Sequence, residues 1–119
     1  MRKVMVINKD NLNIIMEQGE LANTFFKRFK GLLGRKRICP GEGLLIYPCK
    51  MIHSFGMSLE IDVLFVSKQN RIVHIIERML PNKISKHIKN ASYVLELPSG
   101  QAARTGTKGG QELCVVVER

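Results

Sequence analysis

The chain has 119 residues, 45% hydrophobic and 24% charged, a composition that excludes an intrinsically disordered tail. Nineteen Lys and Arg against ten Asp and Glu give a net charge of +9, which favours nucleic acid, anionic lipid or acidic protein as partners. Three cysteines without framework spacing argue against a disulfide scaffold and suit a reducing compartment. We expect a single domain over residues 1–119, cytoplasmic and without a membrane span, because no apolar run is long enough for one.

The N-terminal residues predict a β-hairpin. Val4–Ile7 is a short β-rich run, Asn8–Asn11 is a turn sequence, and a second strand-like run follows over Leu12–Glu17.

The clearest helical period of the chain follows, near residues 24–34. Large apolar residues recur there at helical spacing, namely Leu21, Phe25, Phe29 and Leu32. Asn23 or Thr24 can cap the start of this helix and Gly34 can end it. The pattern predicts one short amphipathic helix whose aromatic residues face the core.

The remainder of the chain reads as strands separated by turns. Strand-like runs cover Leu44–Tyr47, Leu59–Val66, Arg71–Glu77, Ser92–Leu97 and Leu113–Glu118. Pro81–Asn90 is a polar loop with room for one helical turn, and Ser99–Thr105 is a second short helical candidate. The predicted class is mainly β (α+β), an antiparallel sandwich or barrel with one short helix packed on it.

The segment from Pro48 to Met57 contains the residues best suited to catalysis or metal binding. It places the Cys49 thiol four residues before the His53 imidazole, between a proline and Gly56, so a loop is favoured over a helix or strand. Three interpretations stay open: structural residues, a thiol nucleophile with its base, or metal ligands completed by Asp62, Glu60 or Cys39.

Two carboxylates lie inside apolar strands. Asp62 shares a strand face with Leu64, and Glu96 stands between Leu95 and Leu97. Each needs a partner if it is buried, and Arg28 or Arg35 could pair with Asp62. The candidate site is therefore Cys49, His53, Phe55, Met57, Asp62 and Glu96, with Cys49, His53 and Asp62 as the candidate metal ligands.

Basic residues are concentrated in and after the predicted helix. Six of them fall within eleven positions, namely Lys27, Arg28, Lys30, Arg35, Lys36 and Arg37. This density suits a polyanion or an acidic protein surface. The chain contains no recognised nucleic-acid motif, and a solvated basic face is the competing interpretation.

Three ordered motifs resemble the family filed as domain of unknown function 192. They are Ala22–Thr24 leading to Arg28 and Lys30–Arg35, Pro48–Met57 running into Ile61–Phe65, and Val94–Gly100 followed by Gly106 and Gly110. The resemblance covers roughly residues 12 to 116 and implies a compact β-sandwich or barrel, with no assigned activity, substrate or cofactor. The chain departs from the family at Ser54, where Thr is common, and at Gln111, where Asp is common.

Three functions remain in competition. The first is a small binding or accessory protein with a polar site around Cys49–Met57. The second is a metal-binding or thiol-dependent enzyme using Cys49 and His53, and the third is a polyanion or nucleic-acid binder through residues 27–37. The sequence leaves the ligand, the cofactor and the oligomeric state open.

Overall fold

The computed structural model describes residues 2–119, apart from the side chains of Phe25, Phe26 and Phe29. The predicted core-facing position of those three aromatic side chains therefore lies outside the described part. The described residues form seven strands and two short helices: β1 (Lys3–Asn8), β2 (Ile14–Ala22), α1 (Phe25–Lys30), β3 (Gly41–Ile46), β4 (Ile61–Ser67), β5 (Ile72–Met79), β6 (Ala91–Pro98), α2 (Gln101–Arg104) and β7 (Leu113–Val117).

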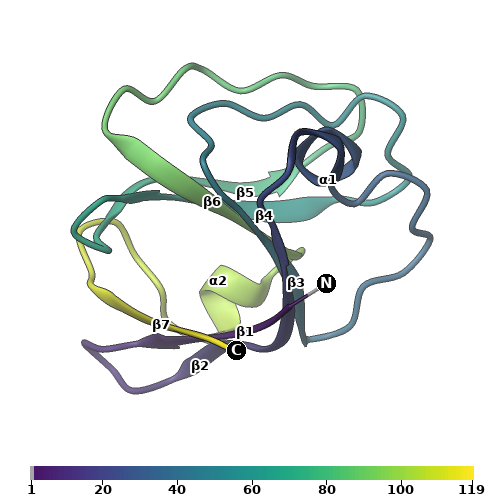
Figure 1. The fold of residues 1–119 in the computed structure, drawn as a ribbon. Coiled ribbons are helices and arrows are strands. Elements are labelled where there is room, and N and C mark those ends of the chain that lie inside the picture. Colours follow the sequence, from purple (N-terminus) through teal and green to yellow (C-terminus); the bar gives the residue numbers. More distant parts are fainter. Residues whose placement is uncertain (1) are drawn as a thin grey trace.

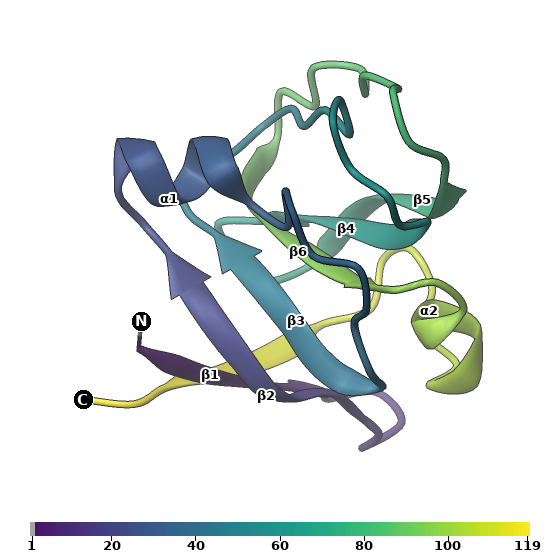
Figure 2. The ribbon, with the colours of Figure 1, turned by 90° about the vertical axis from the view of Figure 1, so that its right-hand side faces the viewer.

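The strands form one curled sheet in the order β5-β4-β6-β3-β2-β1-β7, so the predicted mainly β class is confirmed (Figure 1). The N-terminal hairpin is confirmed too, since β1 pairs antiparallel with β2. One pair departs from the antiparallel prediction: β2 and β3 are parallel, because the chain returns through α1 before it forms β3 (Figure 2).

The curl brings the two edge strands together at one end. The Gly110 N–H donates to the Ile72 carbonyl over 2.7 Å, and the Leu113 N–H donates to the Asn70 carbonyl over 2.8 Å. These bonds join the start of β5 to the start of β7, which gives the sheet its half-barrel shape, with α2 lying inside the curve (Figure 1).

The strands β4 and β6 carry apolar residues on both faces, and each face has its own core. The inner core, within the curl, includes Leu64 and Leu95, and the outer core includes Val63 and Val94. All seven residues of β4 are buried. Because successive strand residues alternate between the faces, Asp62 points to the inner core and Glu96 to the outer core.

The helix α1 is shorter than the predicted 24–34. Thr24 is its N-cap, accepting a hydrogen bond from the Lys27 N–H over 3.2 Å, as the sequence suggested. It ends at Gly31 instead of Gly34, because Gly31 takes a φ of 49° and its N–H closes the last turn on the Lys27 carbonyl.

The loop after β5 contains no helical turn in its described residues. Residues 81–90 instead run extended beside residues 49–57, joined by an isolated β-bridge between His53 and Ile84. The second helical candidate is confirmed as α2.

In the described part of the chain, no helix is long and apolar enough to cross a membrane.

Candidate functional site

A cavity of about 270 Å³ opens on the outer face of the sheet, between α1, the loop before β4, and β6. Its walls are mostly apolar, with a small number of charged and polar groups. The lining includes Arg28, Gly31, Cys49, Ile52, His53, Met57 and Glu96.

Glu96 forms the buried polar end of this cavity. Its neighbours Leu95 and Leu97 pack in the inner core, so the carboxyl group points to the outer face. The residue is only 3% exposed and its Oε1 atom has no hydrogen-bond partner among the described residues. Burial raises the pKa of this carboxyl group to about 7, because the charged form loses its hydration.

Gly31 allows the chain to pass closely over this carboxyl group. A Cβ atom at Gly31 would lie 3.3 Å from Glu96 Oε1. The glycine that ends α1 therefore also leaves space at the acid, a role that no motif in the sequence indicated.

Arg28 supplies the second charged group of the cavity. Its Nη1 donates to the Pro48 carbonyl over 3.2 Å, whereas its buried Nε has no partner among the described residues. The charges of Glu96 and Arg28 act in opposite directions on the pKa of the Cys49 thiol, so all three groups belong to one local electrostatic environment.

Cys49 and His53 both line the cavity, but the hydrogen bond and the raised pKa of Cys49 do not favour a nucleophile–base pair. Cys49 Sγ donates to the Met51 carbonyl over 3.3 Å, and burial is the main cause that raises the thiol pKa. His53 Nδ1 accepts from the Phe55 N–H over 3.2 Å, and the two rings stack with centroids 5.4 Å apart. A nucleophilic cysteine needs a lowered pKa, which is the opposite of what burial produces at Cys49.

This geometry predicts an unreactive Cys49. With iodoacetamide near pH 8, we expect Cys49 to be alkylated more slowly than the exposed Cys39 and Cys114, because burial raises the pKa of its thiol and limits access of the reagent. Peptide mass spectrometry of one time course gives all three rates. The urea-unfolded chain is the control, where the rates should converge, and a Cys49 that reacts fastest in the folded protein would restore the nucleophile hypothesis.

Asp62 does not join the predicted site. It is fully buried on the inner face, where Oδ1 accepts from the Arg78 N–H and Oδ2 from the Ala102 N–H, each over 2.9 Å. Its partners are thus two backbone groups, and the predicted pairing with Arg28 or Arg35 is wrong. Among the described residues, no three His, Cys, Asp or Glu side chains gather closely enough to hold a metal ion, so the suggested set of Cys49, His53 and Asp62 is not formed.

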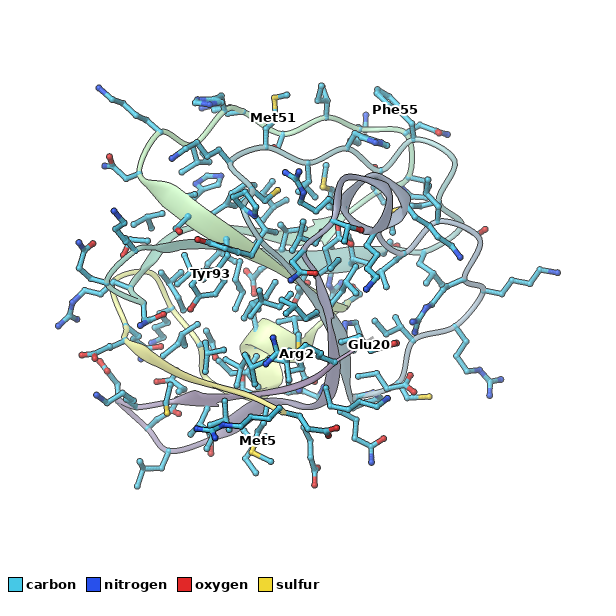
Figure 3. The ribbon with its side chains drawn as sticks, in the orientation of Figure 1. Arg2, Met5, Glu20, Met51, Phe55 and Tyr93 are labelled. Carbon is cyan, nitrogen blue, oxygen red and sulfur yellow. The ribbon has the colours of Figure 1, made fainter. Side chains whose placement is uncertain are left out.

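The other two candidates have different positions. Met57 is buried in the outer core and lines the cavity. Phe55 is half exposed at the loop surface and does not line it (Figure 3).

Four of the six basic residues lie in different surroundings. Arg28 belongs to the cavity, and Arg35 pairs with Glu20 over 2.9 Å. Lys36 and Arg37 line a separate shallow groove together with Arg104, a residue that sequence proximity could not have linked to them.

The family model for domain of unknown function 192, described as "Uncharacterized ACR", matches residues 6–115. The chain belongs to this family. A UPF0127 protein of Thermococcus sibiricus (strain DSM 12597 / MM 739) is 31% identical over 121 residues, covering 96% of this chain and 76% of the relative. The resemblance drawn from the three motifs is thereby confirmed.

Two solved structures share the fold. A protein of unknown function from Novosphingobium aromaticivorans DSM 12444 has a TM-score of 0.82 at 24% identity, covering 94% of this chain and 83% of that one. A protein from Sinorhizobium meliloti 1021, described as a candidate transcription regulator, has a TM-score of 0.79 at 27% identity, covering 96% and 92%.

Proposed function

We propose that this member of the family binds a small amphipathic molecule in the cavity between α1 and β6. The observation that carries the proposal is the buried Glu96 carboxyl group, whose Oε1 atom lies at this cavity and has no hydrogen-bond partner in the described part of the chain. A buried polar atom without a hydrogen bond costs about 1–3 kcal/mol, so such an atom at a cavity marks a place where a ligand gains free energy. The free cysteines favour a cytoplasmic location as part of this proposal.

The chemistry of the walls suggests the class of ligand. Glu96, with a pKa of about 7, exists in both protonation states near neutrality and can accept or donate a hydrogen bond. Arg28 Nε is a donor to which no described residue is hydrogen-bonded, and Ile52 and Met57 contribute apolar wall. A ligand with one hydrogen-bond donor, one acceptor and a short apolar body could bond to both Glu96 and Arg28 while its apolar part contacts the apolar wall.

The volume limits the size of this ligand. Pockets for drug-sized molecules begin at about 300 Å³, and this cavity of about 270 Å³ lies just below that range. We therefore expect a small metabolite or a primary amide of fragment size.

Titration of the ¹⁵N-labelled protein with hexanamide, hexylamine and hexanoate tests the proposal. Hexanamide offers both a donor and an acceptor, so it should give saturable shifts at the backbone amides of Gly31, Cys49, Ile52 and Met57. We expect Glu96→Leu and Arg28→Met each to weaken its binding about tenfold, the value of one hydrogen bond to a charged group.

Glu60→Gln is the matched control, because Glu60 is an exposed carboxylate outside this cavity, and it should bind hexanamide like the wild type. Shifts that do not saturate, or that occur equally in all variants, would overturn the proposal.

Nucleic-acid binding is a second candidate. It is favoured by the groove of Lys36, Arg37 and Arg104 and by the description of the Sinorhizobium meliloti relative as a candidate transcription regulator. It has less support than the cavity, because Arg28 and Arg35 are engaged elsewhere. Duplex DNA is included in the experiment below for this reason.

A further inference from the structure

The two long loops on the outer side of the sheet form one paired layer. The Ser54 N–H donates to the Lys83 carbonyl over 2.8 Å, and the Ser85 N–H donates to the Ile52 carbonyl over 2.9 Å. Residues 49–57 and 80–90 are thereby held side by side at the edge of the molecule remote from β1 and β7 (Figure 1).

Side-chain hydrogen bonds fix this layer further. Ser54 Oγ donates to the Leu80 carbonyl over 2.6 Å and accepts from the Lys83 N–H over 2.9 Å. Ser85 Oγ accepts from the Ile52 N–H over 2.9 Å. The outward side chains of the loops are thus presented by a defined backbone.

Large apolar side chains project from this layer into solvent. The two loops carry Met51, Phe55 and Ile84, the last of which lies opposite His53 in the isolated β-bridge. These three residues are 47%, 49% and 60% exposed, and Leu80 at the start of the second loop is 50% exposed. Figure 3 shows Met51 and Phe55 pointing away from the body of the molecule.

The second of these loops also carries positive charge. Lys83, Lys86 and Lys89 are all exposed, and neither loop contains an aspartate or glutamate between residues 49–57 or 80–90. We call Met51, Phe55, Leu80 and Ile84 with Lys83, Lys86 and Lys89 the rim patch. It adjoins the cavity, since Met51 also lines it.

We propose that the rim patch docks the protein onto the surface of an anionic phospholipid bilayer. Exposed apolar side chains insert among the headgroups, and each nearby lysine gains from the negative surface potential. Single-stranded nucleic acid fits less well, because Phe55 is the single aromatic among the four apolar side chains of the rim patch and the other three offer no face for base stacking. The proposal does not depend on what the cavity binds.

Vesicle co-sedimentation at physiological ionic strength tests the proposal. The wild type should sediment with vesicles that contain phosphatidylglycerol. It should remain in solution when the vesicles contain only phosphatidylcholine. We expect Phe55→Ser with Ile84→Ser, and separately Lys83→Glu with Lys86→Glu, each to weaken binding about tenfold or more. None of these four residues lines the cavity.

Matched controls lie on the opposite side of the molecule. Leu12→Ser with Val116→Ser removes exposed apolar surface there, and Lys3→Glu with Lys108→Glu reverses exposed charge. Both pairs should bind phosphatidylglycerol vesicles nearly as well as the wild type, with at most a twofold loss from the change in net charge.

Three results would overturn the proposal. They are absence of binding to phosphatidylglycerol vesicles, equal loss in the controls and the rim-patch variants, and binding to labelled duplex DNA with the vesicle binding insensitive to Phe55→Ser and Ile84→Ser. The last result would show that the positive charge of the protein binds polyanions in general and that the apolar side chains of the rim patch play no part. Circular dichroism of each variant distinguishes a lost contact from a lost fold.

Discussion

Replacing Asp62 with alanine is expected to destabilise the protein by about 3–5 kcal/mol, the largest effect of any single polar substitution considered for this fold. The carboxylate satisfies the buried N–H groups of Arg78 and Ala102, each over 2.9 Å. Removing it leaves two buried donors unpaired, at about 1–3 kcal/mol each, in addition to losing two charge-assisted hydrogen bonds.

The position of Asp62 explains why the structure depends on it. The register of β4 and β5 shifts between Ile61 and Val63, opposite Arg78, whose φ is 54°. Ala102 belongs to α2, and it is buried in the inner core within the curled sheet. The Asp62 side chain therefore holds two elements in place. They are the irregular stretch of the edge strand β5 at Arg78 and the helix α2, which closes the inner core.

Urea unfolding measures this loss, and hydrogen exchange locates it. Asp62→Asn keeps one acceptor oxygen, so it should cost about 2 kcal/mol and remain measurable even if the alanine variant does not fold. Glu60→Ala, at an exposed neighbouring position, should stay within about 0.5 kcal/mol of the wild type. The prediction is wrong if the amides of Arg78 and Ala102 exchange no faster in Asp62→Asn.

A second large effect is expected from pH, through Glu96. Its pKa is raised from 4.5 to about 7 by burial, so the folded state binds this proton more tightly than the unfolded state. Its contribution is fully present below about pH 4.5 and is lost as the pH rises through about 7. At about 1.4 kcal/mol for each tenfold change in proton affinity, the loss is about 3 kcal/mol.

Comparison with Glu96→Gln isolates this effect from other titrating groups. In urea unfolding at about pH 4.5 and about pH 8, the stability of Glu96→Gln relative to the wild type should increase by about 3 kcal/mol toward the higher pH. Glu60→Gln serves as the control for removing one negative charge. A relative stability that stays constant with pH would contradict the buried, unpaired state of Glu96, whether or not the cavity binds hexanamide.

Much of the local structure was predictable from the sequence, because it follows from short-range patterns. The alternation around Leu64 and Leu95 located the strands, and Thr24 was recognisable as a helix cap since capping needs only a hydroxyl before an N–H. The end of α1 was misplaced because Gly31 and Gly34 both have positive φ and only the folded chain shows which of them terminates the helix.

The carboxylates Asp62 and Glu96 mark the boundary between what the sequence and the tertiary structure decide. By itself, the sequence determined the mainly β class, the family, and the fact that both acids lie in buried strands. Only the tertiary structure placed them on opposite faces of the sheet, giving Asp62 two backbone partners and leaving Glu96 Oε1 at a cavity. The physical reason is that alternation defines the two faces of a strand, whereas the groups that cover each face come from distant segments of the chain.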